Sequence, residues 1–122
     1  MRKHLLSVAA FVSILFVTDA CVDHDLASSI PVDCSGAETV SYNDHIKPIV
    51  VSICSNCHNT TDFPERDWTN PVLLHEYASE ASRRVRLSTT DPDHMPKDPP
   101  ELTLDQIKSI VCWAEQGAPI DN

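Results

Sequence analysis

The chain has 122 residues, of which 18 are acidic and 9 are basic, and its formal net charge at neutral pH is −9. Such an acidic chain is a poor partner for nucleic acid, because the phosphate backbone repels it. The length allows one small domain, near the lower limit for a fold held together by a hydrophobic core alone. A bound cofactor or a covalent cross-link is therefore expected to add stability.

The first twenty residues have the layout of a secretory signal peptide. Arg2 and Lys3 precede an apolar stretch over residues 5–17, and small residues follow it. The apolar stretch is too short to span a bilayer. We therefore expect residues 1–20 to be a signal peptide and the protein to be exported by a bacterium, either to the periplasm or as a membrane-anchored lipoprotein.

Cys21 follows the apolar stretch directly. The sequence V-T-D-A-C that ends at this residue resembles a bacterial lipobox, in which the cysteine becomes the lipidated first residue of the mature protein. Asp19 is unusual in such a motif, so ordinary cleavage near Ala20, with Cys21 free or in a disulfide, stays open. Residues 21–40 are rich in acidic residues, Ser, Pro and Gly without a helical period, and are expected to form a flexible tether.

The rest of the chain predicts an all-α fold with three helices and no strand. The first helix has Ser41, Asn43 or Asp44 as its N-cap, and its apolar positions are Ile46, Ile49, Val50 and Ile53. The second starts at Asn70-Pro71, and its apolar side consists of Leu74, Tyr77, Ala78, Ala81 and Val85. The third begins at a capping box, Thr103 with Gln106, and ends at Gly117. Residues 59–71 and 91–100 have loop composition.

The most specific motif in the chain is C-S-N-C-H, from Cys54 to His58. A c-type haem is attached where two thiols with this spacing add to the two vinyl groups of the porphyrin and the adjacent histidine binds the iron. Cys54 and Cys57 are therefore candidate haem-attachment residues, and His58 is the candidate proximal ligand of the iron.

Three other interpretations of this motif were weighed. A zinc site needs two further ligands, and His75 and His94 do not belong to a second paired motif. A thioredoxin-like dithiol follows a strand and precedes a helix, whereas here a helix is expected before the motif and a loop after it. A structural disulfide between Cys54 and Cys57 would close a strained small ring.

The order of motifs resembles a known family, the small monohaem cytochrome c domains of bacterial lipoproteins and exported enzymes. The resemblance covers roughly residues 40–122, and the matching residues are Asp44, Ile46, Lys47, Pro48, Ile49, Cys54, Cys57, His58, Met95, Pro96, Trp113, Gly117, Ala118 and Pro119. It implies a class I-like cytochrome c domain over residues 41–122, with about three helices and irregular loops wrapped round one covalent haem c.

The resemblance also implies that Met95 is the distal ligand of the iron. Independently, Met95 is the only methionine outside the expected signal peptide, and it lies in a proline-bounded loop. Its neighbour His94 is the rival, because two histidines can also ligate a haem. An open or His94-ligated distal site would instead suit a haem enzyme or a sensor of a gas or peroxide.

Two cysteines remain once Cys54, Cys57 and Cys21 have been assigned. In an exported chain, Cys34 and Cys112 are expected to form a disulfide. The function expected from these residues is single-electron transfer between redox partners at the membrane surface, with no catalytic residue. Because the chain is acidic, a partner with a basic docking face is expected, and the association should weaken as salt rises.

Overall fold

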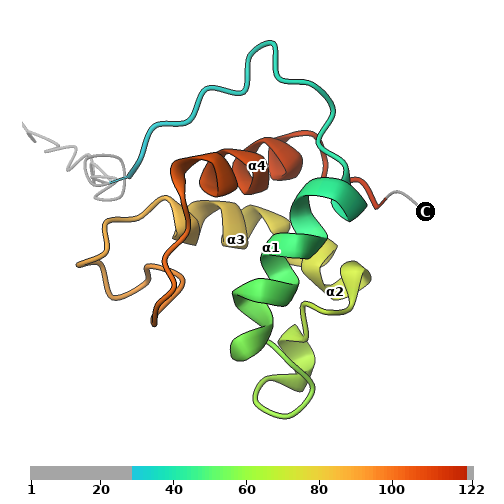
Figure 1. Cartoon of the computed structure of the whole chain (residues 1–122), viewed down its shortest axis with the longest axis vertical. Helices are drawn as coiled ribbons and strands as arrows, with labels where there is room; N and C mark the ends of the chain where they lie inside the picture. Colours follow the sequence, from blue (N-terminus) through green and yellow to red (C-terminus); the bar gives the residue numbers. More distant parts are fainter. Residues whose placement is uncertain (1–28, 121–122) are drawn as a thin grey trace, which may run out of the picture.

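The structure, a computed structural model, describes residues 29–120 (Figure 1). The expected signal peptide, residues 1–20, and the lipidation candidate Cys21 lie outside the described residues. Within 29–120 every regular element is a helix and no strand is present, so the protein is all-α, as the sequence predicts. None of the helices in this range has the length and apolar character needed to cross a lipid bilayer.

The first helical segment leads from the chain's N-terminal part to the C-S-N-C-H motif. It consists of a π-helical turn, η1 (Tyr42–Ile46), that continues into α1 (Lys47–Ser52). Of the three N-cap candidates, Ser41 is used: its hydroxyl accepts a hydrogen bond from the backbone N–H of Asp44 at 3.1 Å. Pro48 lies in the first turn of α1, where its missing N–H costs no helical hydrogen bond.

The second predicted helix is interrupted in the structure. Asn70 caps α2 (Pro71–Glu76), as expected, but the helix stops at Tyr77 and α3 (Ala78–Val85) begins after it. The backbone of Tyr77 has ψ 7°, and its N–H is shared between the carbonyls of Leu73 and Leu74. The Tyr77 ring also lies 5.3 Å below the guanidinium of Arg66, which belongs to the preceding loop. Because the helix breaks at Tyr77, the described residues contain four α-helices where the sequence predicts three. Helical periodicity could not reveal the tertiary contact of Tyr77 with Arg66.

The last helix, α4 (Leu104–Glu115), organises the core. Its capping box is formed as predicted, with Thr103 and Gln106 exchanging hydrogen bonds of 2.8 and 3.2 Å, and Gly117 follows the helix with a positive φ. Figure 1 shows α4 alongside α3, and α4 also contacts η1. Trp113 is completely buried, 6.2 Å from the Tyr42 ring, and its indole N–H donates to the carbonyl of Pro119.

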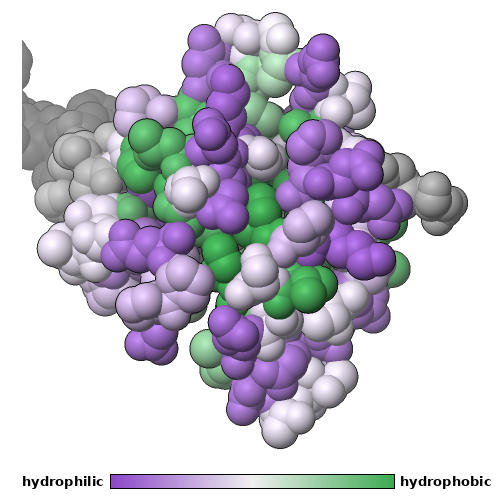
Figure 2. Space-filling model, in the orientation of Figure 1, coloured by the Kyte–Doolittle hydropathy of each residue, from purple (hydrophilic) through white to green (hydrophobic). Residues whose placement is uncertain are grey.

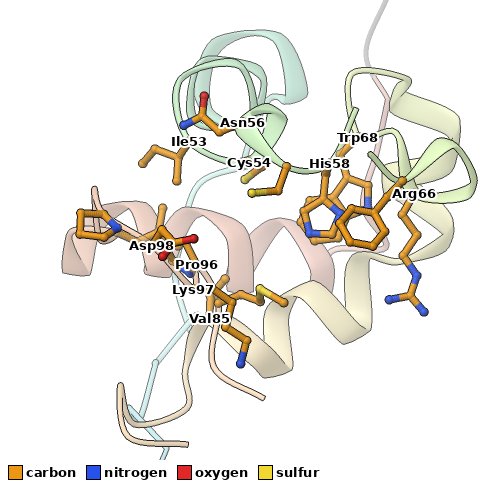
Figure 3. A pocket seen from close by; sticks show the side chains of 15 residues that line it. Ile53, Cys54, Asn56, His58, Arg66, Trp68, Val85, Pro96, Lys97 and Asp98 are labelled. Atoms are coloured by element: carbon orange, nitrogen blue, oxygen red, sulfur yellow. The ribbon is translucent and has the colours of Figure 1, made fainter. Parts of the chain in front are cut away.

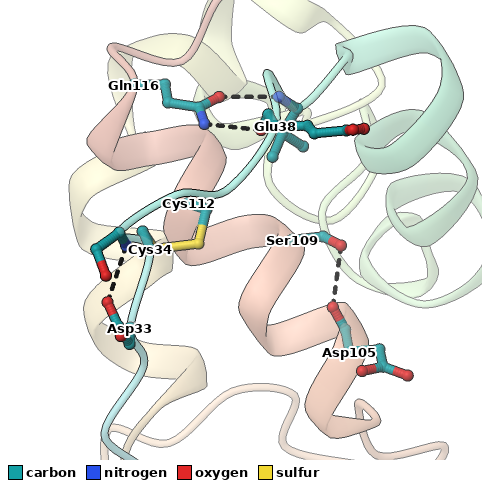
Figure 4. The surroundings of a disulfide bond; sticks show 9 residues. Asp33, Cys34, Glu38, Asp105, Ser109, Cys112 and Gln116 are labelled. Atoms are coloured by element: carbon teal, nitrogen blue, oxygen red, sulfur yellow. Dashed lines mark hydrogen bonds between the residues drawn. A yellow bond between two sulfur atoms is a disulfide. The ribbon is translucent and has the colours of Figure 1, made fainter.

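Residues 29–40 differ from the flexible tether predicted over 21–40. They lack regular structure, yet they run along α4 and are fixed to it (Figures 1 and 4). The disulfide expected between Cys34 and Cys112 is present and links this segment to the helix. The Gln116 side chain adds two hydrogen bonds, to the N–H of Val40 and the carbonyl of Glu38. Composition indicates how a segment behaves alone, and here tertiary bonds override it.

Removing the disulfide is predicted to destabilise the fold strongly. The bridge spans 78 residues of sequence, so a Cys34→Ser variant should lose about 2–5 kcal/mol of unfolding free energy. Urea unfolding followed by circular dichroism measures this loss. Wild-type protein treated with a reductant is the matched control and should show the same loss. An unchanged unfolding midpoint in both samples would contradict the prediction.

A small ion-pair network covers the exposed side of α3. The Glu80 carboxylate accepts hydrogen bonds from Arg83 at 3.0 Å and from Arg84 at 2.6 Å. These hydrogen bonds lower the pKa of Glu80 from 4.5 to about 2. The ionised carboxylate is thus favoured in the folded state, and this contribution to stability is complete above pH 4.5 and is lost as the pH falls through about 2.

A Glu80→Gln variant is therefore expected to be less stable than the wild type at neutral pH. Solvent screens the half-exposed carboxylate, so the loss should be no more than about 1 kcal/mol. The difference should shrink below pH 4.5 and vanish near pH 2. Urea unfolding at several pH values measures it, with Glu76→Gln, a neighbouring exposed carboxylate, as control. A difference between Glu80→Gln and wild type that does not change with pH would refute the assignment.

Candidate functional site

A cavity of about 470 Å³ lies among three segments of the chain. One wall comes from the C-S-N-C-H motif, another from the aromatic loop (residues 59–70), and the third from the methionine loop (residues 86–103) together with the end of α3. The volume falls within the range of cofactor sites, about 300–1,000 Å³. Figure 2 shows a face that is hollowed near its centre, where apolar residues are exposed between hydrophilic ones. The residues that line the cavity are mostly apolar, as expected for a bound organic group.

Local backbone geometry turns the motif into one wall of the cavity. After α1 the chain tightens into a 3₁₀ turn, η2 (Cys54–Asn56), and the carbonyl of Cys54 accepts hydrogen bonds from the N–H groups of Cys57 and His58 at 3.2 and 2.8 Å. The turn directs both thiols and the imidazole to the cavity (Cys54 and His58 are labelled in Figure 3). Both cysteines are free thiols, Cys54 partly buried and Cys57 exposed.

The environment of Cys54 is unlike that of a redox-active dithiol. Burial raises the pKa of the Cys54 thiol to about 11. Reactive cysteines of disulfide oxidoreductases have lowered pKa values, since the thiolate is the nucleophile. Cys54 is thus mostly protonated at physiological pH.

His58 is held by aromatic side chains of the aromatic loop. Its ring stacks on Trp68 with 3.8 Å between centroids and 3° between planes, and Phe63 lies 5.8 Å away. The N–H of Trp68 donates to the His58 carbonyl, which ties the loop to the motif. Burial lowers the pKa of His58, so its ring is neutral at pH 7, the form of imidazole that binds a metal.

Two polar atoms in this wall are buried without a hydrogen-bond partner among the described residues. They are Nδ1 of His58 and the indole nitrogen of Trp68. Trp68 as a whole is only 8% exposed. Buried polar groups are normally hydrogen-bonded, so unpaired ones indicate a group that the protein alone does not supply. Both residues line the cavity. Because the backbone of Arg66 lies close enough to the His58 ring to act on its pKa as a hydrogen-bond partner, the indole nitrogen of Trp68 is the clearer sign of a group that the protein does not supply.

The structure separates the two rival distal ligands. Met95 lines the cavity from the methionine loop, and its N–H donates to the carbonyl of Arg84 at 3.3 Å. His94 does not line the cavity, and its Nδ1 is bonded to the carbonyl of Leu87 at 2.8 Å. Four of the predicted site residues thus share one cavity: Cys54, Cys57, His58 and Met95.

The structure offers no further ligands to a zinc site in the part of the chain it describes. His75 is bonded to the carbonyl of Ala118 and does not line the cavity. Among residues 29–120, no three side chains of the types His, Cys, Asp and Glu come together as a potential metal site. A structural zinc ion takes four such ligands.

Sequence reasoning missed part of the site. Trp68 is buried in the core and also lines the cavity beside His58, and Phe63 and Arg66 line the cavity with it. The one hint was two aromatic residues within a stretch of turn-forming residues. Arg83 and Arg84 pair with Glu80 on α3 and with Asp93 in the methionine loop.

Comparisons with known proteins do not assign a function, so the functional argument rests on the residues of the cavity. No protein-family model matches the chain, and neither the curated proteins nor the solved structures give a match.

The different surroundings of the two thiols lead to a chemical prediction for the chain before any cofactor is attached. Iodoacetamide should modify exposed Cys57 well before Cys54, because a pKa of about 11 leaves about one Cys54 thiol in a thousand ionised at pH 8. The Cys54 rate should rise about tenfold per pH unit toward pH 11. Peptide mass spectrometry over time measures both rates. Faster modification of Cys54 at pH 8 would favour the dithiol interpretation.

Proposed function

We propose that the protein is an exported monohaem c-type cytochrome that transfers single electrons between redox partners. Cys54 and Cys57 bind haem c covalently, His58 is the proximal ligand of its iron, and Met95 is the distal one. The observation that carries the proposal is that these four residues line one apolar cavity although Met95 is far from the motif in sequence, while His94 stays outside it.

The residues present fit a covalently attached haem in chemical type and in position. In attachment, each thiol adds across one vinyl group: the sulfur bonds to one vinyl carbon and the hydrogen goes to the other, so no oxidant is needed. The apolar walls suit a porphyrin, the Nδ1 of a ligating His58 would be free to bond a backbone carbonyl or ordered water, and the indole nitrogen of Trp68 could donate to a polar group of the cofactor.

Haem held by histidine and methionine supplies a reversible one-electron couple at a higher potential than bis-histidine haem. The protein residues have three tasks. The Trp68 stack orients the His58 ring, Met95 would be the second ligand of the iron and would exclude small molecules, and the apolar walls would limit the access of water. None of them acts as acid, base or nucleophile, so the proposal is an electron carrier and not an enzyme.

The arrangement of helices supports a cytochrome c-like fold as part of the proposal. The N-terminal segment, η1 with α1, contacts the C-terminal helix α4, and α1 leads directly into the motif. Two irregular loops, 59–70 and 86–103, line the cavity between them. This is the arrangement that the sequence resemblance implies for residues 41–122.

Export is part of the same proposal and has one structural support. Disulfides persist in oxidising compartments such as the bacterial periplasm, and the Cys34–Cys112 bridge needs one. With a net charge of −9, the protein is suited to redox partners with a basic face and not to nucleic acid. Lipidation of Cys21 would hold it at the membrane surface.

Spectra of the protein expressed with a c-type maturation system test the function. We expect a pyridine haemochrome of covalent haem and the weak near-infrared charge-transfer band of methionine ligation in the oxidised protein. A Met95→Ala variant should lose this band and have a lower reduction potential, whereas the matched variant His94→Ala should keep both.

Other spectral results would point to the alternatives. A protein without haem but with stoichiometric zinc would overturn the proposal. Covalent low-spin haem that lacks the band in the wild type, and that becomes high-spin in His94→Ala but not in Met95→Ala, would make His94 the ligand. A wild-type protein with high-spin haem that binds carbon monoxide readily would move the function to a gas or peroxide sensor or a haem enzyme.

A further inference from the structure

We infer that Asp93 is a positioning residue for the axial methionine, acting through its ion pairs with Arg83 and Arg84 on α3. The inference rests on the proposed function, because it assigns a role in iron ligation, and it adds residues that neither the motif nor the cavity lining identifies. Met95 belongs to a long irregular loop, and such a loop by itself would not hold the methionine sulfur in one position.

Ion pairs tie the loop to α3 close to Met95. The Asp93 carboxylate lies 3.2 Å from a guanidinium nitrogen of Arg83 and 3.7 Å from one of Arg84. Glu80 also binds both arginines, at 3.0 and 2.6 Å, and so helps to hold their guanidinium groups in place. The network thus presents Asp93 with two positioned cations.

Backbone and ring hydrogen bonds continue this attachment to Met95 itself. The N–H of Met95, two residues after Asp93, donates to the carbonyl of Arg84, the same residue whose side chain faces Asp93. Between them, the His94 ring binds the carbonyl of Leu87, a residue 1% exposed. Three consecutive residues are therefore fastened to α3 or to the core beside it.

The loop is stiff enough to transmit the position of Asp93. The Asp91 side chain accepts a hydrogen bond from the N–H of Asp93 at 2.7 Å, and its carbonyl accepts one from the N–H of His94 at 3.1 Å. The ammonium of Lys97 binds the carbonyl of Pro92 across the same turn. A shift of Asp93 thus moves Met95 with it.

The anchor on α3 is also rigid, since α3 packs on α4 in the core. Asp93 itself is exposed, with 52% of its side-chain surface open to solvent, so replacing it does not disturb packing. Exposed pairs are weak one by one and are screened by salt. Loss of the pair should loosen the loop without unfolding the protein, and the iron–methionine bond should open more often.

Competition by imidazole for the distal position tests the inference on the haem-loaded full chain. Relative to wild type, Asp93→Asn should bind imidazole about three to ten times more tightly, because Met95 is displaced more easily. Asp93→Glu should restore most of the difference. Glu101→Gln makes the same charge change on the same loop at an exposed residue that has no ion pair within residues 29–120, and should behave as wild type.

Two further measurements separate positioning from a general effect of charge. In 1 M salt, wild type and Asp93→Asn should converge, because screening acts over about 3 Å there. Amide hydrogen exchange, followed by mass spectrometry, should be about three to ten times faster over residues 92–97 in Asp93→Asn and unchanged in α4. Asp93→Asn should also increase the affinity for imidazole less in the Arg83→Gln background than in the wild type, because its partner Arg83 is already absent there.

The outcomes distinguish this inference from the proposed function. Equal imidazole affinity and equal exchange in wild type, Asp93→Asn and Glu101→Gln, with the charge-transfer band intact in all three, would overturn the role of Asp93 and leave the cytochrome assignment standing. A wild-type protein that lacks haem or the methionine band would overturn the proposed function, and the role of Asp93 with it.

Discussion

The burial of α4 is the interaction on which the rest of the structure depends. A chain this short has few apolar side chains to bury, and α4 brings the largest of them, Trp113, to full burial beside Tyr42 while its other side packs on α3. Because α4 contacts both η1 and α3, it fixes the segment that leads into the motif relative to the segment that leads into the methionine loop. The disulfide to Cys34 adds a covalent link to the same helix.

The cavity lies among the segments that this small core holds in place. Around it, α1 and the aromatic loop contribute the thiols, the imidazole and the Trp68 stack, while α3 and the methionine loop contribute the thioether. Two of its buried polar atoms have no partner among the described residues, and its walls are mainly apolar. Under the proposed function, a covalently bound porphyrin would complete the core of this domain as well as supply its redox chemistry.

Local sequence patterns predicted the helices well where local bonds decide them. The Thr103 capping box, the Asn70 cap and the Gly117 terminus are all present, because each depends on residues close together in the chain. The prediction was wrong at Tyr77 and for residues 29–40. A cation–π contact from a distant loop accompanies the break in the helix, and a disulfide with long-range hydrogen bonds fixes the expected tether.

By itself the sequence determined the all-α class and the pair of thiols with its adjacent histidine. It also reduced the candidates for the proposed distal ligand to Met95 and His94. Only the tertiary structure decided that Met95 lines the cavity while His94 binds a backbone carbonyl, that Trp68 stacks on His58, and that Asp93 is paired with α3. The reason is physical: a motif encodes spacing along the chain, whereas the direction of a side chain in a long loop depends on contacts with residues that are distant in sequence.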